Sequence, residues 1–395
     1  MSDAPRDRIA TLAVHAGHVS SEHLGAAMPP LYQSATFLAA DTAELEAINE
    51  GRQRGFVYSR IRNPTVLAAE QRLAALEGAE SAILFASGMA AVAGALAPFL
   101  SAGDEIVTLP DIYGGSIRYF TDILPRQGIG VRWAASIGPE DVAVSIGPKT
   151  KLIYAETPTN PLVRVVDLAA LAAIAKSAGA LLVVDSTLGG PMNQRPLELG
   201  TDLVIHSASK YLNGHSDLIV GAVAGRRELT KQVRALQQAS GGIIDPFGAW
   251  LLMRGMTTYP LRMAQHNRSG LAVAQFLAAH PAVKRVHYPG LADHPDHALA
   301  CRQMSGFGGL VSFEVADEAT ARAVVDRARL FGIGPSIGGV ESLISQPSNT
   351  SHHSVTPARR IEMGIVPELV RLSIGIEDSD DLIADLAQAL ETKHE

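Results

Sequence analysis

Short apolar runs alternate with amphipathic stretches through the middle of the chain. Such runs, when bounded by polar or turn residues, are typical of strands that are buried on both faces of a sheet. Between two of them, segment 167–179 has the apolar spacing of a helix, with Asp167 placed to cap its start and Gly179 its end. The runs predicted as strands are 104–110, 150–156, 180–186, 201–207 and 218–225. This alternation predicts an α/β fold with a doubly wound, mainly parallel sheet covered by helices.

One run is unusual because residues 81–103 carry no charged side chain. A run of this length can cross a bilayer, but Gly88, Gly94 and Pro98 interrupt it and much of its apolarity comes from alanine. We therefore expect a strand at 81–86, a turn at Ser87 and Gly88, and a helix at 89–100. A helix N-terminus at such a turn suits an anion, most often a phosphate. A tight turn between two buried elements is the alternative interpretation.

The pattern changes at both ends of the chain and indicates three parts. Residues 1–55 contain several glycines and the Pro29-Pro30 pair, with one expected helix at 42–51, so we interpret them as an arm that lies on another surface. Residues 56–250 form the expected α/β domain. Residues 251–395 combine an expected helix at 272–280, strands at 308–316 and 369–377, and a final helix at 380–391. They predict a smaller α+β domain.

Composition and charge exclude several classes of protein. The chain has 395 residues, of which 47% are hydrophobic, and a formal net charge of −7. It is therefore expected to fold around real cores, and it has no basic block that would bind nucleic acid or an anionic membrane. The single cysteine, Cys301, excludes an intramolecular disulfide. Because residues 1–10 lack the apolar core of a secretory signal, we expect a cytoplasmic protein.

Polar residues follow the predicted strands, at the sheet edge where ligands bind in open α/β folds. The charge of Asp185 at the end of a buried run needs a cationic partner, unless the residue is only a helix N-cap. Lys210 follows another buried run, where a desolvated amine is a nucleophile, although a surface lysine is the simpler alternative. The polar groups after the strands are 87–88, 111–115, 156–161, 185–187 and 206–210. A lysine, an acid, an aromatic face and a phosphate cradle together match pyridoxal phosphate.

The motifs around these groups resemble those of the Cys/Met-metabolism family of pyridoxal-phosphate enzymes. The resemblance extends from about residue 15 to residue 390. It implies the fold type I of these enzymes, which is similar to that of aspartate aminotransferase. The matching segments are YSRIRNPT (58–65), FASGMAA (85–91), DIYGGS (111–116), ETPTNP (156–161), VVDST (183–187), HSASKYLNGHSD (206–217), SIGGVESLIS (336–345) and LVRLSIGIED (369–378).

The resemblance also implies roles for individual residues. Lys210 resembles the lysine that holds the cofactor and then carries the proton, and Tyr113 resembles the stacking tyrosine, a candidate acid or base for the leaving group. Asp185 resembles the partner of the pyridine nitrogen. The other residues implied to bind the cofactor are Tyr58, Arg60, Ser87, Gly88, Met89, Asn160, Thr187, Ser207 and Ser209. Those implied to bind substrate are Asn160, Glu341, Ser342 and Arg371, and no metal site is expected.

The resemblance further implies an assembly and a reaction class. Tyr58 and Arg60 match residues that reach the phosphate from a neighbouring subunit, so we expect a homotetramer built from dimers that share active sites. The substrates would be small amino acids derived from homoserine or homocysteine, and the reaction a γ-replacement or γ-elimination. Tyr-Gly-Gly-Ser-Ile-Arg at 113–118 and Glu341 favour the cystathionine γ-synthase and γ-lyase branch.

The alternative within the family is a methionine γ-lyase or an O-acylhomoserine sulfhydrylase. Gly115 stands where methionine γ-lyases usually carry Cys, and Gln237-Gln238 replace their Lys-Asp pair. The segment 184–191 and Gln346 also depart from the family pattern. These departures lie near the expected substrate region and leave an unusual substrate open.

Other classes have weaker support. Residues 207–210 satisfy the S-x-x-K pattern of serine acyl-enzymes, but no S-D-N or K-T-G accompanies them. The histidine pairs 15 and 18 or 352 and 353 are better explained by structural or solvated roles than by a metal, and no nucleotide-binding glycine motif is present. A catalytically silent family member is the remaining alternative, and the intact Lys210 and Asp185 argue against it.

Overall fold

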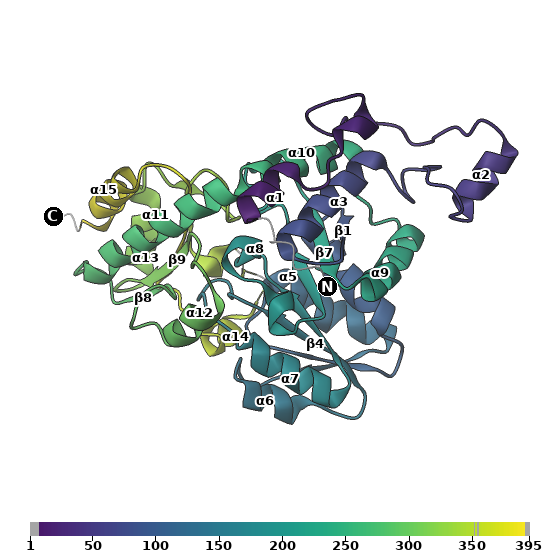
Figure 1. Cartoon of the computed structure of the whole chain (residues 1–395). Coiled ribbons are helices and arrows are strands. Elements are labelled where there is room, and N and C mark those ends of the chain that lie inside the picture. Colours follow the sequence, from purple (N-terminus) through teal and green to yellow (C-terminus); the bar gives the residue numbers. More distant parts are fainter. Residues whose placement is uncertain (1–7, 351, 354, 392–395) are drawn as a thin grey trace.

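A seven-stranded sheet forms the centre of the larger part of the molecule (Figure 1). The computed structural model describes residues 8–350, 352–353 and 355–391. The strand order is β1-β7-β6-β5-β4-β2-β3; β7 is antiparallel to both of its neighbours, and the other pairs are parallel. The strands are β1 (Ser81–Phe85), β2 (Glu105–Thr108), β3 (Gly130–Trp133), β4 (Thr150–Glu156), β5 (Leu181–Asp185), β6 (Leu203–His206) and β7 (Gly221–Gly225).

The predicted α/β fold and its predicted strands are confirmed. The pattern missed β3, which is four residues long, lies at the edge of the sheet, contains Arg132 and is only partly buried. An edge strand of this kind lacks the continuous apolar run that marked the central strands.

The uncharged run 81–103 divides as predicted. β1 ends at Phe85, and α4 (Gly88–Leu96) begins after Ser87, whose hydroxyl oxygen accepts a hydrogen bond from the Ala90 N–H at 3.1 Å. A short 3-10 turn, Ala97–Phe99, follows the helix. In the part of the chain that the structure describes, no helix is long and apolar enough to cross a membrane.

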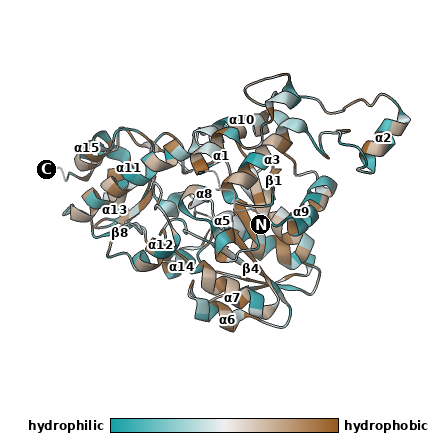
Figure 2. Ribbon diagram, viewed as in Figure 1, coloured by the Kyte–Doolittle hydropathy of each residue, from teal (hydrophilic) through white to brown (hydrophobic). Residues whose placement is uncertain are grey.

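Helices cover both faces of the large sheet, so the strands are apolar on both sides (Figure 2). Neighbouring residues of β1 show this, because Ile83 packs in the core on one face and Leu84 in the core on the other. In α7, Asp167 and Gly179 cap the two ends as predicted. The helices of this part are α3 (Pro64–Glu77), α4, α5 (Gly114–Arg118), α6 (Pro139–Ser145), α7 (Leu168–Ala178), α8 (Gly190–Asn193), α9 (Arg227–Ser240) and α10 (Pro246–Thr257).

The N-terminal segment differs from the prediction of a single helix. Besides α2 (Thr42–Asn49), the structure contains α1 (Ile9–His15), which packs on the large domain of its own chain with Ala13 fully buried. The Arg72 side chain donates to the Ala16 carbonyl oxygen at 2.9 Å and fixes the end of this helix. The short helix was missed because seven residues give too few turns for a clear period. Residues 1–7 of the expected arm lie outside the described residues.

The middle of the arm extends away from the rest of the chain, with α2 at its tip (Figure 1). None of the residues of α2 is buried, and Leu24 and Leu38 are almost fully exposed. A segment that exposes large apolar side chains in this way is expected to pack on another surface.

A five-stranded sheet of order β10-β11-β12-β9-β8 forms the core of the smaller C-terminal part. The boundary expected at residue 250 falls inside α10, and the long helix α11 (Tyr259–Ala279) leads into this sheet. Residues 392–395 of the expected domain are not described. Its other elements are β8 (Arg285–His287), α12 (His297–Gln303), β9 (Leu310–Glu314), α13 (Glu318–Arg327), β10 (Gly332–Ile333), β11 (Leu343–Ser345), α14 (Pro357–Glu362), β12 (Leu369–Ser373) and α15 (Ser379–Leu390).

Candidate active site

A cavity of about 640 Å³ opens at the carboxyl ends of the parallel strands, between the two sheets. Residues from the large domain and from the loops and strands of the smaller one line it. The predicted site residues that line this cavity are Ser87, Gly88, Met89, Tyr113, Asn160, Asp185, Thr187, Ser207, Ser209, Lys210, Glu341 and Arg371. Tyr58, Arg60 and Ser342 are the predicted residues that do not line it.

Lys210 lies after β6 and its amino group faces the smaller domain. Its Nζ donates a hydrogen bond to the Ser336 hydroxyl oxygen at 2.9 Å. Burial, with a smaller contribution from the positive charge of Arg371, lowers the pKa of the Lys210 amine. The side chain is therefore placed and tuned to act as a nucleophile and base.

Ser336 was missed by the sequence analysis, although it lies in the quoted segment 336–345. Its φ is +104°, which is unusual for a residue with a side chain, and its carbonyl oxygen accepts from the Arg371 Nη2 at 3.2 Å. Backbone strain of this kind is concentrated at functional sites. Ser336 thus connects the candidate nucleophile to the cation of the cavity.

Asp185 ends β5 and receives two hydrogen bonds from Thr187. The Thr187 hydroxyl and backbone N–H donate to Oδ1 at 2.5 and 3.0 Å. Thr187 Oγ1 in turn accepts from the Ser207 N–H at 2.8 Å. Burial raises the pKa of Asp185, whereas the bonds from Thr187 lower it. The carboxylate therefore needs a cationic group bound in the cavity to be fully stabilised.

The N-terminus of α4 forms a concave cradle. The Gly88 and Met89 N–H groups are the first of the helix and have no intrahelical acceptor. A Cβ on Gly88 would lie 2.9 Å from the Ser207 side chain, so only glycine keeps this corner open. Ser209 stands beside it, with its hydroxyl oxygen accepting from the Val220 N–H at 2.8 Å.

Tyr113 forms a side of the cavity, and 44% of the residue's surface is exposed. Its backbone N–H donates to Glu156 Oε2 at 2.7 Å. A Cβ on Gly115 would lie 2.5 Å from the Tyr113 ring and 3.1 Å from the Met89 sulfur. Because residue 115 is glycine, the ring lies in this position without displacing a neighbouring side chain.

Arg371 in β12 is the buried cation of the cavity, with 3% of its surface exposed. Its Nη1 donates to the Asn160 side-chain oxygen at 3.2 Å, and its Nε has no partner among the described residues. Burial lowers the pKa of Arg371 to about 10. A buried guanidinium with a free donor is suited to a carboxylate.

Of the two neighbouring residues expected to bind substrate, Glu341 lines the cavity and Ser342 does not. The Glu341 carboxylate accepts a hydrogen bond from the Ser216 hydroxyl. The Ser342 hydroxyl donates to Glu377 Oε2 and accepts from the Gly375 N–H, both at 2.8 Å. Ser342 is 1% exposed, and both functions of its hydroxyl, as donor and as acceptor, are used inside the fold.

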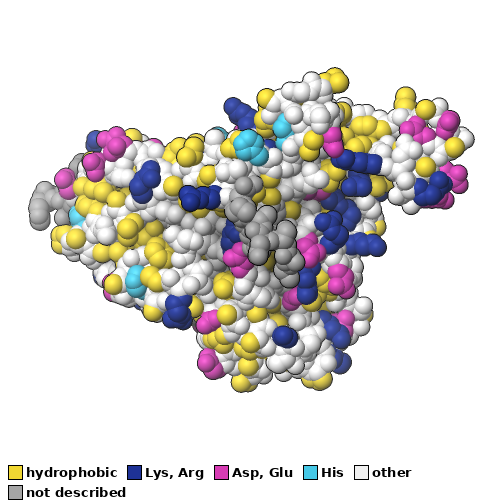
Figure 3. Space-filling model, viewed as in Figure 1, with side chains coloured by type: hydrophobic (Ala, Val, Ile, Leu, Met, Phe, Trp, Pro, Cys, Tyr) yellow, Lys and Arg dark blue, Asp and Glu magenta, His cyan; other side chains and the backbone are white. Residues whose placement is uncertain are grey.

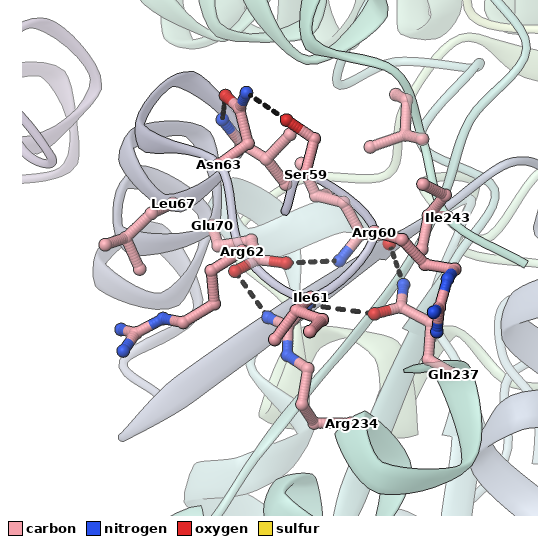
Figure 4. A pocket seen from close by; sticks show the side chains of 13 residues that line it. Ser59, Arg60, Ile61, Arg62, Asn63, Leu67, Glu70, Arg234, Gln237 and Ile243 are labelled. Carbon is pink, nitrogen blue, oxygen red and sulfur yellow. Dashed lines mark hydrogen bonds and ion pairs between the residues drawn. The ribbon is translucent and has the colours of Figure 1, made fainter. Parts of the chain in front are cut away.

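Tyr58 and Arg60 lie together at the base of the arm, away from the cavity. The Arg60 guanidinium is 5.5 Å from the centre of the Tyr58 ring and donates to the Gln238 carbonyl oxygen at 2.6 Å. Arg60 lines a small pocket with Glu70, Arg234 and Gln237 (Figure 4). Figure 3 shows Lys and Arg side chains gathered near the base of the arm on the visible face.

With this geometry established, comparisons identify the relatives of the chain. The model of the family described as "Cys/Met metabolism PLP-dependent enzyme" matches residues 10–391. A cystathionine gamma-lyase of Bacillus subtilis is 44% identical, covering 96% of this chain and 98% of the relative. An L-methionine gamma-lyase of Pseudomonas putida is 42% identical, covering 96% of each chain. The solved structure of metB from Corynebacterium glutamicum is similar with a TM-score of 0.92, at 38% identity, covering 97% of this chain and 98% of that one.

The fold and the cavity define a fold type I pyridoxal-phosphate enzyme. The chain belongs to the Cys/Met-metabolism family of these enzymes. The residues present fit the cofactor, because Lys210 faces the cavity, Gly88 leaves the cradle open and Asp185 is a buried carboxyl without an ion pair among the described residues. The expected fold, family and cofactor are thereby confirmed.

Proposed function

We propose that this enzyme acts in the manner of a cystathionine γ-lyase or γ-synthase. Its substrate would be an amino acid that carries an α-carboxylate at one end and a distal ammonium group at the other. The observation that carries this proposal is that Glu341 and Arg371 line one cavity with Lys210. Arg371 offers a donor to the α-carboxylate, and Glu341 offers an acceptor to a distal ammonium. The 44% identity to a cystathionine gamma-lyase supports it.

The alternative is a methionine γ-lyase or an O-acylhomoserine sulfhydrylase. Gly115 stands where methionine γ-lyases usually carry a cysteine, and this argues against that branch. A serine acyl-enzyme built on 207–210 is less well supported, because the Ser207 side chain belongs to the corner next to Gly88 and no further acyl-enzyme motif is present.

The roles proposed for the residues follow from their places. Pyridoxal phosphate, when bound, supplies an electron sink for bonds at the substrate's Cα. We propose that Lys210 Nζ holds the cofactor and afterwards takes the Cα proton, and that Asn160 and Arg371 orient the α-carboxylate. Tyr113 would stack on the cofactor and move a proton at the leaving group. Asp185 would face the pyridine nitrogen.

The rest of the proposed cofactor site is its phosphate end. The Gly88 and Met89 N–H groups, with Ser87, Ser207 and Ser209 beside them, would hold the phosphate. Tyr58 and Arg60 would reach it from a second copy of the chain, so the enzyme would be a dimer at least, and a cytoplasmic homotetramer of such dimers. Two observations support that assembly: the arm is exposed, and neither Tyr58 nor Arg60 lines the cavity of its own chain.

A substrate panel tests the proposed reaction. Cystathionine, methionine and homocysteine are offered alone, and O-succinyl- or O-acetylhomoserine is offered with cysteine or sulfide. Release of 2-oxobutanoate from cystathionine, or formation of cystathionine from an acylhomoserine and cysteine, is expected. Pyruvate as the only keto acid released from cystathionine would contradict γ-chemistry and assign a β-lyase.

A further inference from the structure

Glu156 lines the cavity but none of the roles above uses it. It ends β4 and pairs in register with Asp185, the last residue of β5. Paired residues of neighbouring parallel strands point to the same face of a sheet, so two carboxyl groups lie side by side at the floor of the site. Glu156 is 6% and Asp185 is 8% exposed.

The environment of Glu156 disfavours its charged form. No ion pair of Glu156 is found among the residues that the structure describes, and the charges that act on it, those of Asp185 and Asp111, are negative. Burial raises the pKa of Glu156 well above its usual value, the charge of Asp185 and then that of Asp111 add to this, and backbone N–H groups of Tyr113 and Asn160 partly oppose it. Two buried carboxyls at such proximity hold one proton between them.

The hydrogen bonds at the two carboxyls decide which of them keeps the charge. Thr187 donates twice to Asp185 Oδ1, including a 2.5 Å bond from its hydroxyl, and a bound pyridinium would add a cation there. Glu156 instead accepts the Tyr113 N–H at 2.7 Å, which a neutral carboxyl oxygen can also do. The charge therefore belongs on Asp185 and the proton on Glu156.

We propose that Glu156 is a positioning residue: an uncharged carboxyl that fixes the backbone of the stacking Tyr113 to the floor of the site and leaves Asp185 as the single negative charge there. This inference rests on the proposed placement of Asp185 at the ring nitrogen. The proposed role requires only an uncharged hydrogen-bond acceptor of the right size at position 156, and a glutamine side chain also supplies one.

Three variants of the holoenzyme test the proposal. Glu156→Gln keeps the size and the acceptor, Glu156→Ala removes both, and Glu156→Asp withdraws the carboxyl by one carbon. The readouts are the pyridoxal-phosphate dissociation constant of the apoenzyme, the induced circular dichroism of the bound cofactor and the pH midpoint of its absorption band. A merely structural residue would change the melting temperature without changing the last two.

We expect Glu156→Gln to bind the cofactor within about threefold of the parent with the same pH midpoint, and Glu156→Ala to bind it at least about tenfold more weakly with a reduced dichroism signal. Glu156→Asp is expected to lie between them. A Glu156→Gln variant that is as defective as Glu156→Ala, or that has a shifted pH midpoint, would contradict the claim that Glu156 is uncharged. A Glu156→Ala variant like the parent would overturn any positioning role.

An Asp185→Ala variant separates this inference from its premise. If Asp185→Ala binds the cofactor with parental affinity and spectrum, the proposed placement of Asp185 fails. If Asp185→Ala is defective while Glu156→Ala is parental, only the role of Glu156 fails.

Discussion

Ser336 shows how much one residue of the site depends on both domains. It lies in the loop between β10 and β11. Its hydroxyl oxygen accepts a hydrogen bond from the Lys210 amine at 2.9 Å, and its carbonyl oxygen accepts one from the Arg371 guanidinium at 3.2 Å. Its left-handed φ of +104° costs about 1–3 kcal/mol in a residue with a side chain. The strained turn therefore holds Lys210 and Arg371, the proposed nucleophile and the proposed carboxylate-binding cation, at one spacing.

Comparing Ser336→Ala with Ser336→Gly separates the hydroxyl from the backbone. Both variants lose the partner of Lys210, so we expect kcat/KM to fall by about tenfold in each. Glycine relieves the strained φ, so the free energy of unfolding of Ser336→Gly should exceed that of Ser336→Ala by about 1 kcal/mol. Ser336→Gly should therefore also unfold at a higher temperature. Equal kcat/KM to the parent in Ser336→Gly would show that the hydroxyl is dispensable.

Arg371 allows a prediction about substrate binding. Replacing it by Ala removes a charge-assisted hydrogen bond to the proposed α-carboxylate, and such bonds contribute about 1.5–3 kcal/mol. We expect kcat/KM for an amino-acid substrate to fall about 10- to 150-fold, while the cofactor remains bound as measured by its absorption. An unchanged KM and kcat would place the carboxylate elsewhere.

Much of the site was predictable because its residues follow apolar strands, and the pattern locates those strand ends in the sequence. Asp185 and Lys210 were found in this way. Ser336 was not, because it is marked by a backbone angle that no pattern reveals. Glu156 was found at a strand end but was given no role, because its importance depends on the register between β4 and β5. The hydrogen bond of the Ser342 hydroxyl to Glu377 could not be predicted either, because the two residues lie 35 positions apart along the chain.

At the scale of elements, the junction between β1 and α4 determines the cradle. The sequence predicted it from a run without charges, because Ser87 and Gly88 break that run at the point where a helix can start. The connection from strand β1 to helix α4 is fixed by the Ser87 cap and by the absence of a side chain on Gly88. By contrast, α1 and β3 are too short and too mixed in polarity for their pattern to identify them.

Gly88→Ala tests the cradle. A Cβ there would lie 2.9 Å from Ser207, so the cradle must shift or close. We expect pyridoxal phosphate to bind at least about tenfold more weakly, measured by titration of the apoenzyme. The matched control is Gly242→Ala, whose Cβ meets no atom closer than 3.8 Å and which should bind normally. Normal binding by Gly88→Ala would place the phosphate away from α4.

At the scale of the whole molecule, the arm is the part that its own chain does not explain. α2 has no buried residue, and the Tyr58 and Arg60 pair lies outside the cavity that the proposal assigns it to serve. The proposed dimer resolves both observations, because the arm of one copy would cover a surface of the other and complete its site.

Mixing two inactive variants tests this sharing of sites. Arg60→Ala and Lys210→Ala are unfolded together and refolded, so that mixed dimers form. If Arg60 acts in the partner's site, each mixed dimer has one intact site, and activity should recover to about a quarter of the parental value at equal mixing. Activity that stays at the level of the separate variants would show that Arg60 and Lys210 act within one chain.

Buried histidines predict how the molecule responds to acid. Burial lowers the pKa of His266 from 6.5 to about 4. The unfolded state therefore binds more protons than the folded state between these values, and stability is lost as the pH falls through this window, by up to about 3 kcal/mol for this group. Asp111 opposes the effect, because burial raises its pKa to about 6. Melting curves between pH 7 and 4.5 should show a smaller loss for His266→Gln than for the parent; an equal loss would exclude His266 as a cause.

The most direct test of the account is the identity of the lysine that holds the cofactor. The purified enzyme, saturated with pyridoxal phosphate, should be yellow, and reduction with borohydride followed by peptide mapping should find the pyridoxyl group on Lys210. Lys210→Ala should carry no such label. A label on another lysine, or a colourless protein that cannot be reconstituted with the cofactor, would contradict the site described above.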